Sequence, residues 1–245
     1  MAADRPHLTV YNEISLDGRI TGFAGDGVRY YTRGFRWPSD AILMGSVTAE
    51  AFGPAESAVE QERELPPLPP VDLPPGFAEL VREPRPLLVV PDSRGRLRCW
   101  RHAQAQPWYA GVVVLVSHAT PAAYLTYLDR RGIRHLTTGE DRVDLVDALA
   151  RLAAELGIGA VRTDAGGELN GALLAAGLVD RIAVIVAPAI GVDPEAQTLI
   201  RLARPLSDGV ALRLVESEVL EDGALSLVYE VAAGIRPAPP RLLQT

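Results

Sequence analysis

The stretch Arg162–Leu174, R-T-D-A-G-G-E-L-N-G-A-L-L, joins a short apolar strand to a helix through two consecutive glycines. We expect the strand to end at Asp164 and the helix to run from Glu168 to Ala176, where Gly177 stops it. Glycines at such a turn let a ligand approach the backbone, and the first N–H groups of the helix favour a phosphate. The same residues also suit a strand-to-helix turn that binds nothing, so the stretch alone leaves both interpretations open.

Apolar runs and helical repeats alternate on both sides of this stretch. The runs expected to form strands are 8–14, 41–44, 87–90, 112–116, 133–136, 159–163 and 182–186, and the clearest helix is 143–156. Residues 211–219 and 225–231 flank the turn Glu221-Asp222-Gly223 and predict a C-terminal hairpin. This alternation is typical of an α/β fold with a mostly parallel central sheet, helices on both faces and an antiparallel hairpin.

The length of 245 residues fits one large domain, which we expect over residues 1–233. Residues 54–75 carry seven prolines and predict an extended loop insertion without helix or central strand. Such a loop is either a lid over a site or a mobile insertion, and the sequence favours neither. Residues 234–245 contain three prolines and predict a flexible C-terminal tail.

Composition excludes several classes of function. A net charge of -7 makes nucleic acid an unsuitable partner, because little would neutralise its phosphates. The 24 basic residues are all arginine, which excludes Schiff-base chemistry and a P-loop lysine. The single cysteine and four scattered histidines predict neither an intrachain disulfide nor a metal site. Without a signal peptide or a long apolar run, we expect a cytoplasmic protein with no membrane partner.

Four segments in order carry a resemblance to a known family. They are S-L-D-G at 15–18, I-L-M-G-S-V-T at 42–48, P-L-L-V-V-P-D-S-R-G-R at 86–96, and T-D-A-G-G-E-L-N-G-A-L-L-A-A-G-L-V-D-R-I at 163–182. Together, over roughly residues 7–232, they resemble the reductase domain of the riboflavin-pathway deaminase-reductase, in the dihydrofolate-reductase-like superfamily. The resemblance implies a dihydrofolate-reductase-like fold, a small-molecule substrate and hydride transfer from NADPH to a C=N or C=O of a pyrimidine- or pterin-like ring. Unbroken apolar strands near a C-terminal hairpin, together with the resemblance, favour a homodimer.

The resemblance also implies roles for individual residues. On the cofactor side these are Thr48, Ser93, Arg94, Gly166, Gly167, Glu168, Leu169 and Asn170, with Arg94 as the candidate for the 2′-phosphate. On the substrate side they are Asp17, Gly27, Phe52 and Asp164. The catalytic candidates are Asp164 and Glu13. The resemblance implies an orienting and electrostatic role for Asp164. Glu13 departs from the family, which has a small residue near the nicotinamide at this place, and a buried glutamate there could donate a proton.

For three of these residues a purely structural role is an alternative to the functional one. Arg94 could be a solvated turn residue, and Asp164 could be the N-terminal cap of the following helix. Glu13 could point to solvent at the end of its strand.

Departures from the family pattern concern the substrate side. The family has two aspartates before a proline where this chain reads Ala51-Phe52-Gly53-Pro54, and its substrate-phosphate arginine has a counterpart only in Arg63, within the insertion. Three functions therefore stay open. They are a riboflavin-pathway reductase, a reductase of a pterin, dihydrofolate or specialised metabolite, and a nucleotide-binding protein that has lost catalysis.

Overall fold

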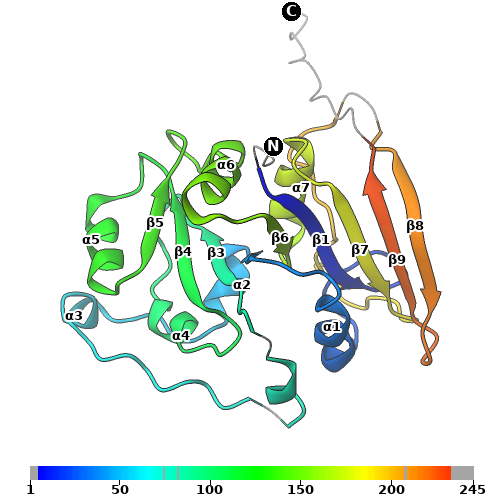
Figure 1. Ribbon diagram of the computed structural model, residues 1–245, viewed down its shortest axis with the longest axis horizontal. Coiled ribbons are helices and arrows are strands. Elements are labelled where there is room, and N and C mark those ends of the chain that lie inside the picture. Colours follow the sequence, from blue (N-terminus) through cyan, green and yellow to red (C-terminus); the bar gives the residue numbers. More distant parts are fainter. Residues whose placement is uncertain (1–4, 74, 82, 207–208, 233–245) are drawn as a thin grey trace, which may run out of the picture. The chain divides into compact units, whose positions relative to one another are not determined.

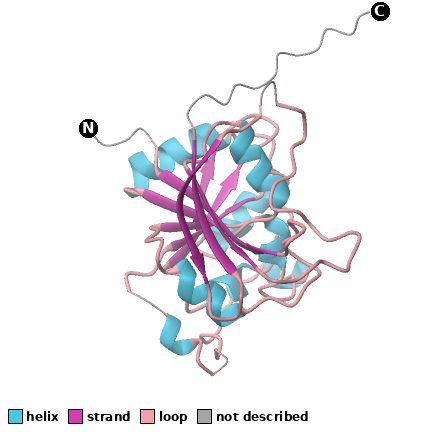
Figure 2. Ribbon diagram, turned by 90° about the vertical axis from the view of Figure 1, so that its right-hand side faces the viewer, coloured by secondary structure: helices cyan, strands magenta, loops and turns pink. Residues whose placement is uncertain are grey.

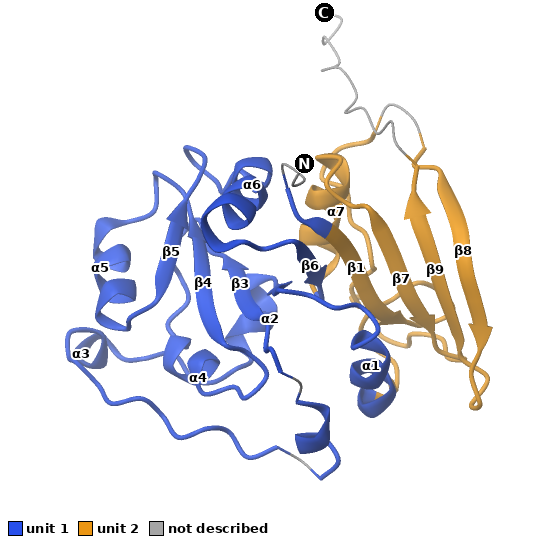
Figure 3. Cartoon of the chain, in the orientation of Figure 1, with its two compact units in different colours: residues 1–7, 27–164 blue, residues 8–26, 165–245 orange. Residues whose placement is uncertain are grey.

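The chain divides into two compact units in a computed structural model that describes residues 5–73, 75–81, 83–206 and 209–232. The first unit consists of residues 1–7 and 27–164, and the second of residues 8–26 and 165–245 (Figure 3). The single domain expected over 1–233 stays a prediction, and the expected tail at 234–245 lies outside the described residues.

Five parallel strands form the sheet of the first unit (Figure 1). They are β2 (Ala41–Leu43), β3 (Leu87–Pro91), β4 (Gly111–Val116), β5 (Arg134–Thr137) and β6 (Ala160–Thr163). Their order is β5-β4-β3-β2-β6, so the strands expected from apolar runs are present and lie side by side. The runs of β2, β3 and β4 are apolar throughout because both faces of a parallel sheet are buried, whereas β5 and β6 also carry polar residues.

Helices alternate with these strands, and Figure 2 distinguishes the two by colour. They are α1 (Gly27–Gly34), α2 (Ser46–Glu50), α4 (Trp100–Gln104), α5 (Ala122–Arg130) and α6 (Leu145–Leu156). Helix α6 begins where the Asp144 carboxylate accepts from two backbone N–H groups, and it ends at Gly157, whose φ of 69° is left-handed. Trp100, Tyr124 and Leu128 fill the core beneath α4 and α5.

The proline-rich insertion contains one helical turn, α3 (Ala58–Gln61), so the expectation of no helix in 54–75 is wrong there. No proline lies within that turn, and Ser57 and Glu60 form a capping box that satisfies its first N–H groups. The other described residues of 54–75 are irregular, as expected. A 3₁₀ turn, η1 (Ala78–Leu80), follows the insertion.

The described residues of the second unit form four strands and one helix. They are β1 (His7–Ile14), α7 (Gly167–Ala175), β7 (Arg181–Val186), β8 (Leu212–Val219) and β9 (Leu225–Val231). Strand β1 pairs with β7 in parallel, whereas β9 pairs with both β7 and β8 antiparallel. The predicted C-terminal hairpin is therefore confirmed, and β8 forms the outer edge of this unit in the strand order.

Candidate active site

A cavity of about 680 Å³ lies within the first unit. Its aromatic lining includes Tyr31, Phe35, Trp37, Phe52, Trp108 and Tyr109. Thr48, Arg162 and Asp164 line it as well, so the cavity brings together three of the predicted site residues, Thr48, Phe52 and Asp164. A concave, mostly apolar pocket with a few polar groups is typical of a site for a small molecule.

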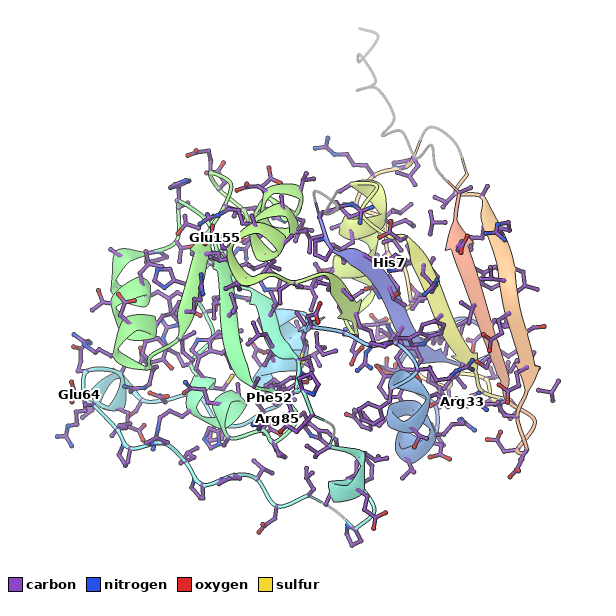
Figure 4. All side chains as sticks on the ribbon, viewed as in Figure 1. His7, Arg33, Phe52, Glu64, Arg85 and Glu155 are labelled. Carbon is purple, nitrogen blue, oxygen red and sulfur yellow. The ribbon has the colours of Figure 1, made fainter. Side chains whose placement is uncertain are left out.

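The aromatic lining is held by contacts between rings. Tyr31 and Trp108 stack in parallel, with ring centroids 5.3 Å apart and planes inclined by 5°. The Phe52 ring meets Tyr109 edge to face at 6.2 Å. Arg85, labelled beside Phe52 in Figure 4, donates from Nη1 to the Tyr109 carbonyl at 3.4 Å. Burial, with the nearby charge of Asp164, raises the pKa of both Tyr31 and Tyr109, so their phenols stay neutral at pH 7.

Asp164 is anchored by Arg162, two residues earlier, because alternate side chains of a strand point to the same face. Arg162 Nε donates to Asp164 Oδ1 at 2.8 Å, and Nη2 donates to Oδ2 at 2.9 Å. The guanidinium also donates from Nη1 to the Gly34 carbonyl at 2.9 Å. This two-point pair fixes the carboxylate in the cavity wall. Asp164 is not a helix cap, because α7 is capped by Gly166 without a side-chain bond.

The turn after β3 holds Ser93 and Arg94, both in the first unit. Ser93 Oγ accepts from the Val143 N–H at 2.9 Å, and its carbonyl accepts from Thr120 Oγ1 at 2.8 Å, so Ser93 also holds the turn in place. Arg94 is exposed and makes no ion pair with a described residue. Gly27, expected on the substrate side, begins α1 and does not line the cavity.

The predicted phosphate site, at the start of α7, belongs to the second unit. A Cβ on Gly167 would collide with the Thr198 carbonyl, and one on Gly166 would lie 2.5 Å from Gln197 Oε1. The backbone of segment 197–201 therefore requires glycine at 167, whereas Gly166 lies against the end of a flexible side chain. The sequence did not indicate either contact. The N–H groups of Gly167, Glu168 and Leu169 have no acceptor among the described residues.

Asn170 lies one residue beyond these N–H groups. Its buried side chain donates from Nδ2 to the carbonyls of Ala165 and Leu199, at 2.9 and 3.1 Å. It therefore fixes the start of the helix from within.

The remaining predicted residues, Asp17 and Glu13, also lie in the second unit. The Gly191 N–H, the Ser15 hydroxyl and Arg19 all donate to the Asp17 carboxylate and lower its pKa to about 2. The Asp17 carboxylate thus stabilises the turn in which it lies. The alternative that Glu13 points to solvent is wrong, because its side chain is buried and Oε2 accepts from the Asp26 N–H at 3.3 Å.

Several cavity residues were not predicted from the sequence. They are Tyr31, Trp108, Tyr109 and Arg162. Two signals were present in the sequence. One is the pair of aromatic doublets at 30–31 and 108–109, and the other is the i, i+2 spacing of Arg162, on β6, and Asp164, directly after β6. Within the described part of the chain, no cluster of metal-ligating side chains occurs, and no helix is long and apolar enough to cross a bilayer.

Comparisons with known proteins agree with the resemblance. Residues 6–226 match the family of RibD C-terminal domains. The chain is 29% identical over 224 residues to 2,5-diamino-6-ribosylamino-4(3H)-pyrimidinone 5′-phosphate reductase of Methanothermobacter thermautotrophicus, covering 88% of this chain and 94% of that protein.

Solved structures show the same fold. A pyrimidine reductase-like protein of Corynebacterium diphtheriae has a TM-score of 0.64 at 19% identity, with 94% of this chain and 93% of that chain covered. RibD of Acinetobacter baumannii has a TM-score of 0.63 at 20% identity over 95% of this chain, which spans 59% of the length of that protein. The predicted fold class, mostly parallel strands with helices and a C-terminal antiparallel hairpin, is thereby confirmed.

Proposed function

The chain belongs to the family of RibD C-terminal domains, and from that premise we propose that it is a reductase that transfers hydride from NADPH to a C=N or C=O of a small heterocycle. The observation that carries this proposal is the carboxylate of Asp164, held by Arg162 in the wall of a 680 Å³ cavity. The cytoplasm remains the expected compartment.

Each group of residues proposed for NADPH has a chemistry that suits one part of a dinucleotide. Three N–H groups of α7 have no acceptor among the described residues, and the positive end of the helix dipole favours a phosphate there. Arg94 is exposed and forms no ion pair among the residues that the structure describes, so its guanidinium is available to a 2′-phosphate. Thr48 has an exposed hydroxyl in the cavity lining, where it can contact the cofactor.

NADPH supplies the hydride when it is bound, and the chain supplies orientation and charge. Asp164 accepts hydrogen bonds from N–H groups of the substrate ring. It also stabilises the positive charge of a C=N group that has been protonated, before the hydride neutralises that charge. Arg162 keeps this carboxylate in one orientation, because two parallel hydrogen bonds leave it little freedom to rotate. Glu13 is the proposed proton donor, with water as the alternative.

The proposal is tested by two separate measurements, NADPH binding and NADPH oxidation. Calorimetric titration should show NADPH binding without any substrate. Loss of absorbance at the nicotinamide band should follow when the pyrimidinone phosphate of the archaeal relative, its dephosphorylated form, or a dihydropterin is added. If NADPH binds but none of these is reduced, the alternative of a catalytically silent nucleotide-binding protein is favoured.

Arg94→Ala is expected to weaken NADPH binding by about 1.5–3 kcal/mol, the usual strength of a hydrogen bond to a charged group, and to leave NADH nearly unchanged. The matched control is Arg96→Ala, since Arg96 is an exposed arginine two residues further along the chain. Calorimetric affinities of both variants for both cofactors check the assignment. Equal affinities of the unmutated protein for NADPH and NADH would contradict it.

We also expect a homodimer. Strand β8 exposes apolar side chains at the end of the strand order, where no other described strand pairs with it, and the exposed fractions are 50% for Leu214 and 74% for Val219. An exposed apolar edge strand is a template for pairing with another chain unless it is covered. Light scattering at micromolar concentration should give twice the chain mass, and a monomer mass would rule the dimer out.

A further inference from the structure

We propose that the aromatic cavity binds a flat ring system that carries no phosphate and is neutral or positively charged. This inference rests on the proposed function, because it names the class of substrate that the reductase takes. It depends on the charge, the walls and the uncharged polar groups of the cavity.

Charge argues against a phosphate. The carboxylate and guanidinium side chains in the lining are those of Asp40, Glu83, Asp164 and Arg162. Arg162 is the single cation among them, and its guanidinium already donates to Asp164 from two nitrogens and to the Gly34 carbonyl from the third. A buried phosphate needs a cation or several donors to replace its lost hydration. No lining guanidinium is left over for that purpose.

The carboxylates of the lining already have hydrogen-bond or ion-pair partners within the protein. Asp40 Oδ2 accepts from the Gly159 and Ala160 N–H groups, at 2.8 and 2.9 Å. Glu83 pairs with Arg85 at 2.9 Å. A phosphate would therefore face three carboxylates in the lining, whereas a neutral ring would meet no like charge. A cationic ring would meet one like charge, that of Arg162, which Asp164 balances.

The one arginine that the sequence suggested for a substrate phosphate lies elsewhere. Arg63 follows α3 in the insertion, and it does not line the cavity. Its carbonyl accepts from Arg131 Nη1 at 2.7 Å, which holds this part of the insertion against α5. Phe52 occupies the cavity lining instead, beside Tyr109.

The walls suit a flat ring. Tyr31 and Trp108 present parallel ring planes, and Tyr109 and Phe52 meet at an interplanar angle of 79°. Aromatic rings bind other rings by offset stacking or edge-to-face contact, and their faces attract cations. The volume of about 680 Å³ lies in the range of sites for drug-sized molecules, so a fused ring system fits.

Uncharged polar groups can give such a ring its orientation. Thr48 and Gln106 line the cavity. The Gln106 amide donates to the His102 carbonyl at 3.2 Å, which leaves its oxygen as an acceptor. The neutral phenols of Tyr31 and Tyr109 add donors. These groups recognise ring N–H and C=O, and Asp164 adds the charged acceptor.

The test uses two pairs of probes that differ by one phosphate. The first pair is riboflavin and flavin mononucleotide, and the second is the ribosylaminopyrimidinone with and without its 5′-phosphate. Affinities are measured by calorimetry on the full chain, with and without saturating NADPH. We expect riboflavin to bind at least about tenfold more tightly than flavin mononucleotide, because the cavity offers the phosphate no partner. In the second pair, adding the phosphate should give no gain in affinity.

Variants show whether the probes bind in this cavity. Trp108→Ala should weaken riboflavin binding about tenfold, while Trp108→Phe, which keeps an aromatic face, should lose less than about threefold. Tighter binding of the phosphorylated member in both pairs, absence of riboflavin binding, or equal losses in the two Trp108 variants would overturn the inference. The affinity for NADPH is measured in a separate titration. A protein that binds no NADPH would contradict the proposed function, whereas the probe affinities test this inference alone.

Discussion

Arg131→Ala is expected to lower the free energy of unfolding by about 3–5 kcal/mol, the usual cost of breaking a buried ion pair from one side. The Arg131 and Glu56 side chains are only 2% and 4% exposed. Arg131 Nε donates to Glu56 Oε2 at 2.8 Å, and Nη2 donates to the same oxygen. Without the guanidinium, the Glu56 carboxylate would remain buried and uncompensated.

The same guanidinium holds the backbone of the insertion. Nη1 donates to the Arg63 carbonyl at 2.7 Å, and Nη2 donates to the Glu60 carbonyl at 2.5 Å. The guanidinium carbon also lies 5.3 Å from the centre of the Tyr127 ring. Of the two roles left open for residues 54–75, a mobile insertion does not fit residues 56–63, because this part is tied to α5.

The preceding residue provides the control for Arg131. Arg130 reaches the same segment, with Nη1 2.9 Å from Glu62 Oε2, but the two side chains are 35% and 73% exposed. Arg130→Ala should therefore cost less than about 1 kcal/mol, as exposed ion pairs do. Urea unfolding followed by circular dichroism measures both variants. A loss for Arg131→Ala no larger than that for Arg130→Ala would contradict the buried-pair argument.

The elements that follow from sequence are those with a local cause. The strand at 112–116 is an unbroken apolar run and becomes β4, and the helix at 143–156 becomes α6 between its Asp144 cap and Gly157. Helix α1 was not predicted, because its eight residues begin and end with glycine and its apolar residues cover little more than one turn. Short elements of that kind depend on tertiary contacts, which local patterns do not contain.

The residues of the candidate site also fall into those with a local sequence signal and those without one. Asp164 could be predicted because it follows an apolar strand, where ligands collect in α/β sheets. Its partner Arg162 follows from strand periodicity once β6 is assigned. The aromatic wall could not be predicted, because Tyr31 and Trp108 are brought together across 77 residues by the fold. The Arg131–Glu56 pair, separated by 75 residues, has no local signal either.

Asp164→Asn is expected to lower kcat/KM about 100-fold, which corresponds to about 2.7 kcal/mol of lost transition-state stabilisation, and to leave NADPH affinity nearly unchanged. Asparagine keeps the size of the side chain and one acceptor for Arg162, so the fold should persist. Turnover is measured with whichever candidate the unmutated protein reduces. The control variant is Asp40→Asn. Asp40 is another carboxylate of the cavity lining, and its Oδ2 accepts hydrogen bonds from the Gly159 and Ala160 N–H groups.

Activity within about threefold of the unmutated protein is expected for Asp40→Asn, because an amide oxygen can accept the same two backbone bonds. Equal activity of both variants would remove Asp164 from the site. The substitution at Asp164 also changes the charge of the cavity, since Arg162 then lacks its anionic partner. Asp164→Asn should therefore bind flavin mononucleotide more tightly relative to riboflavin than the unmutated protein does. That change in the ratio of the two affinities would show that the Arg162–Asp164 pair both presents the carboxylate and disfavours binding of a phosphate.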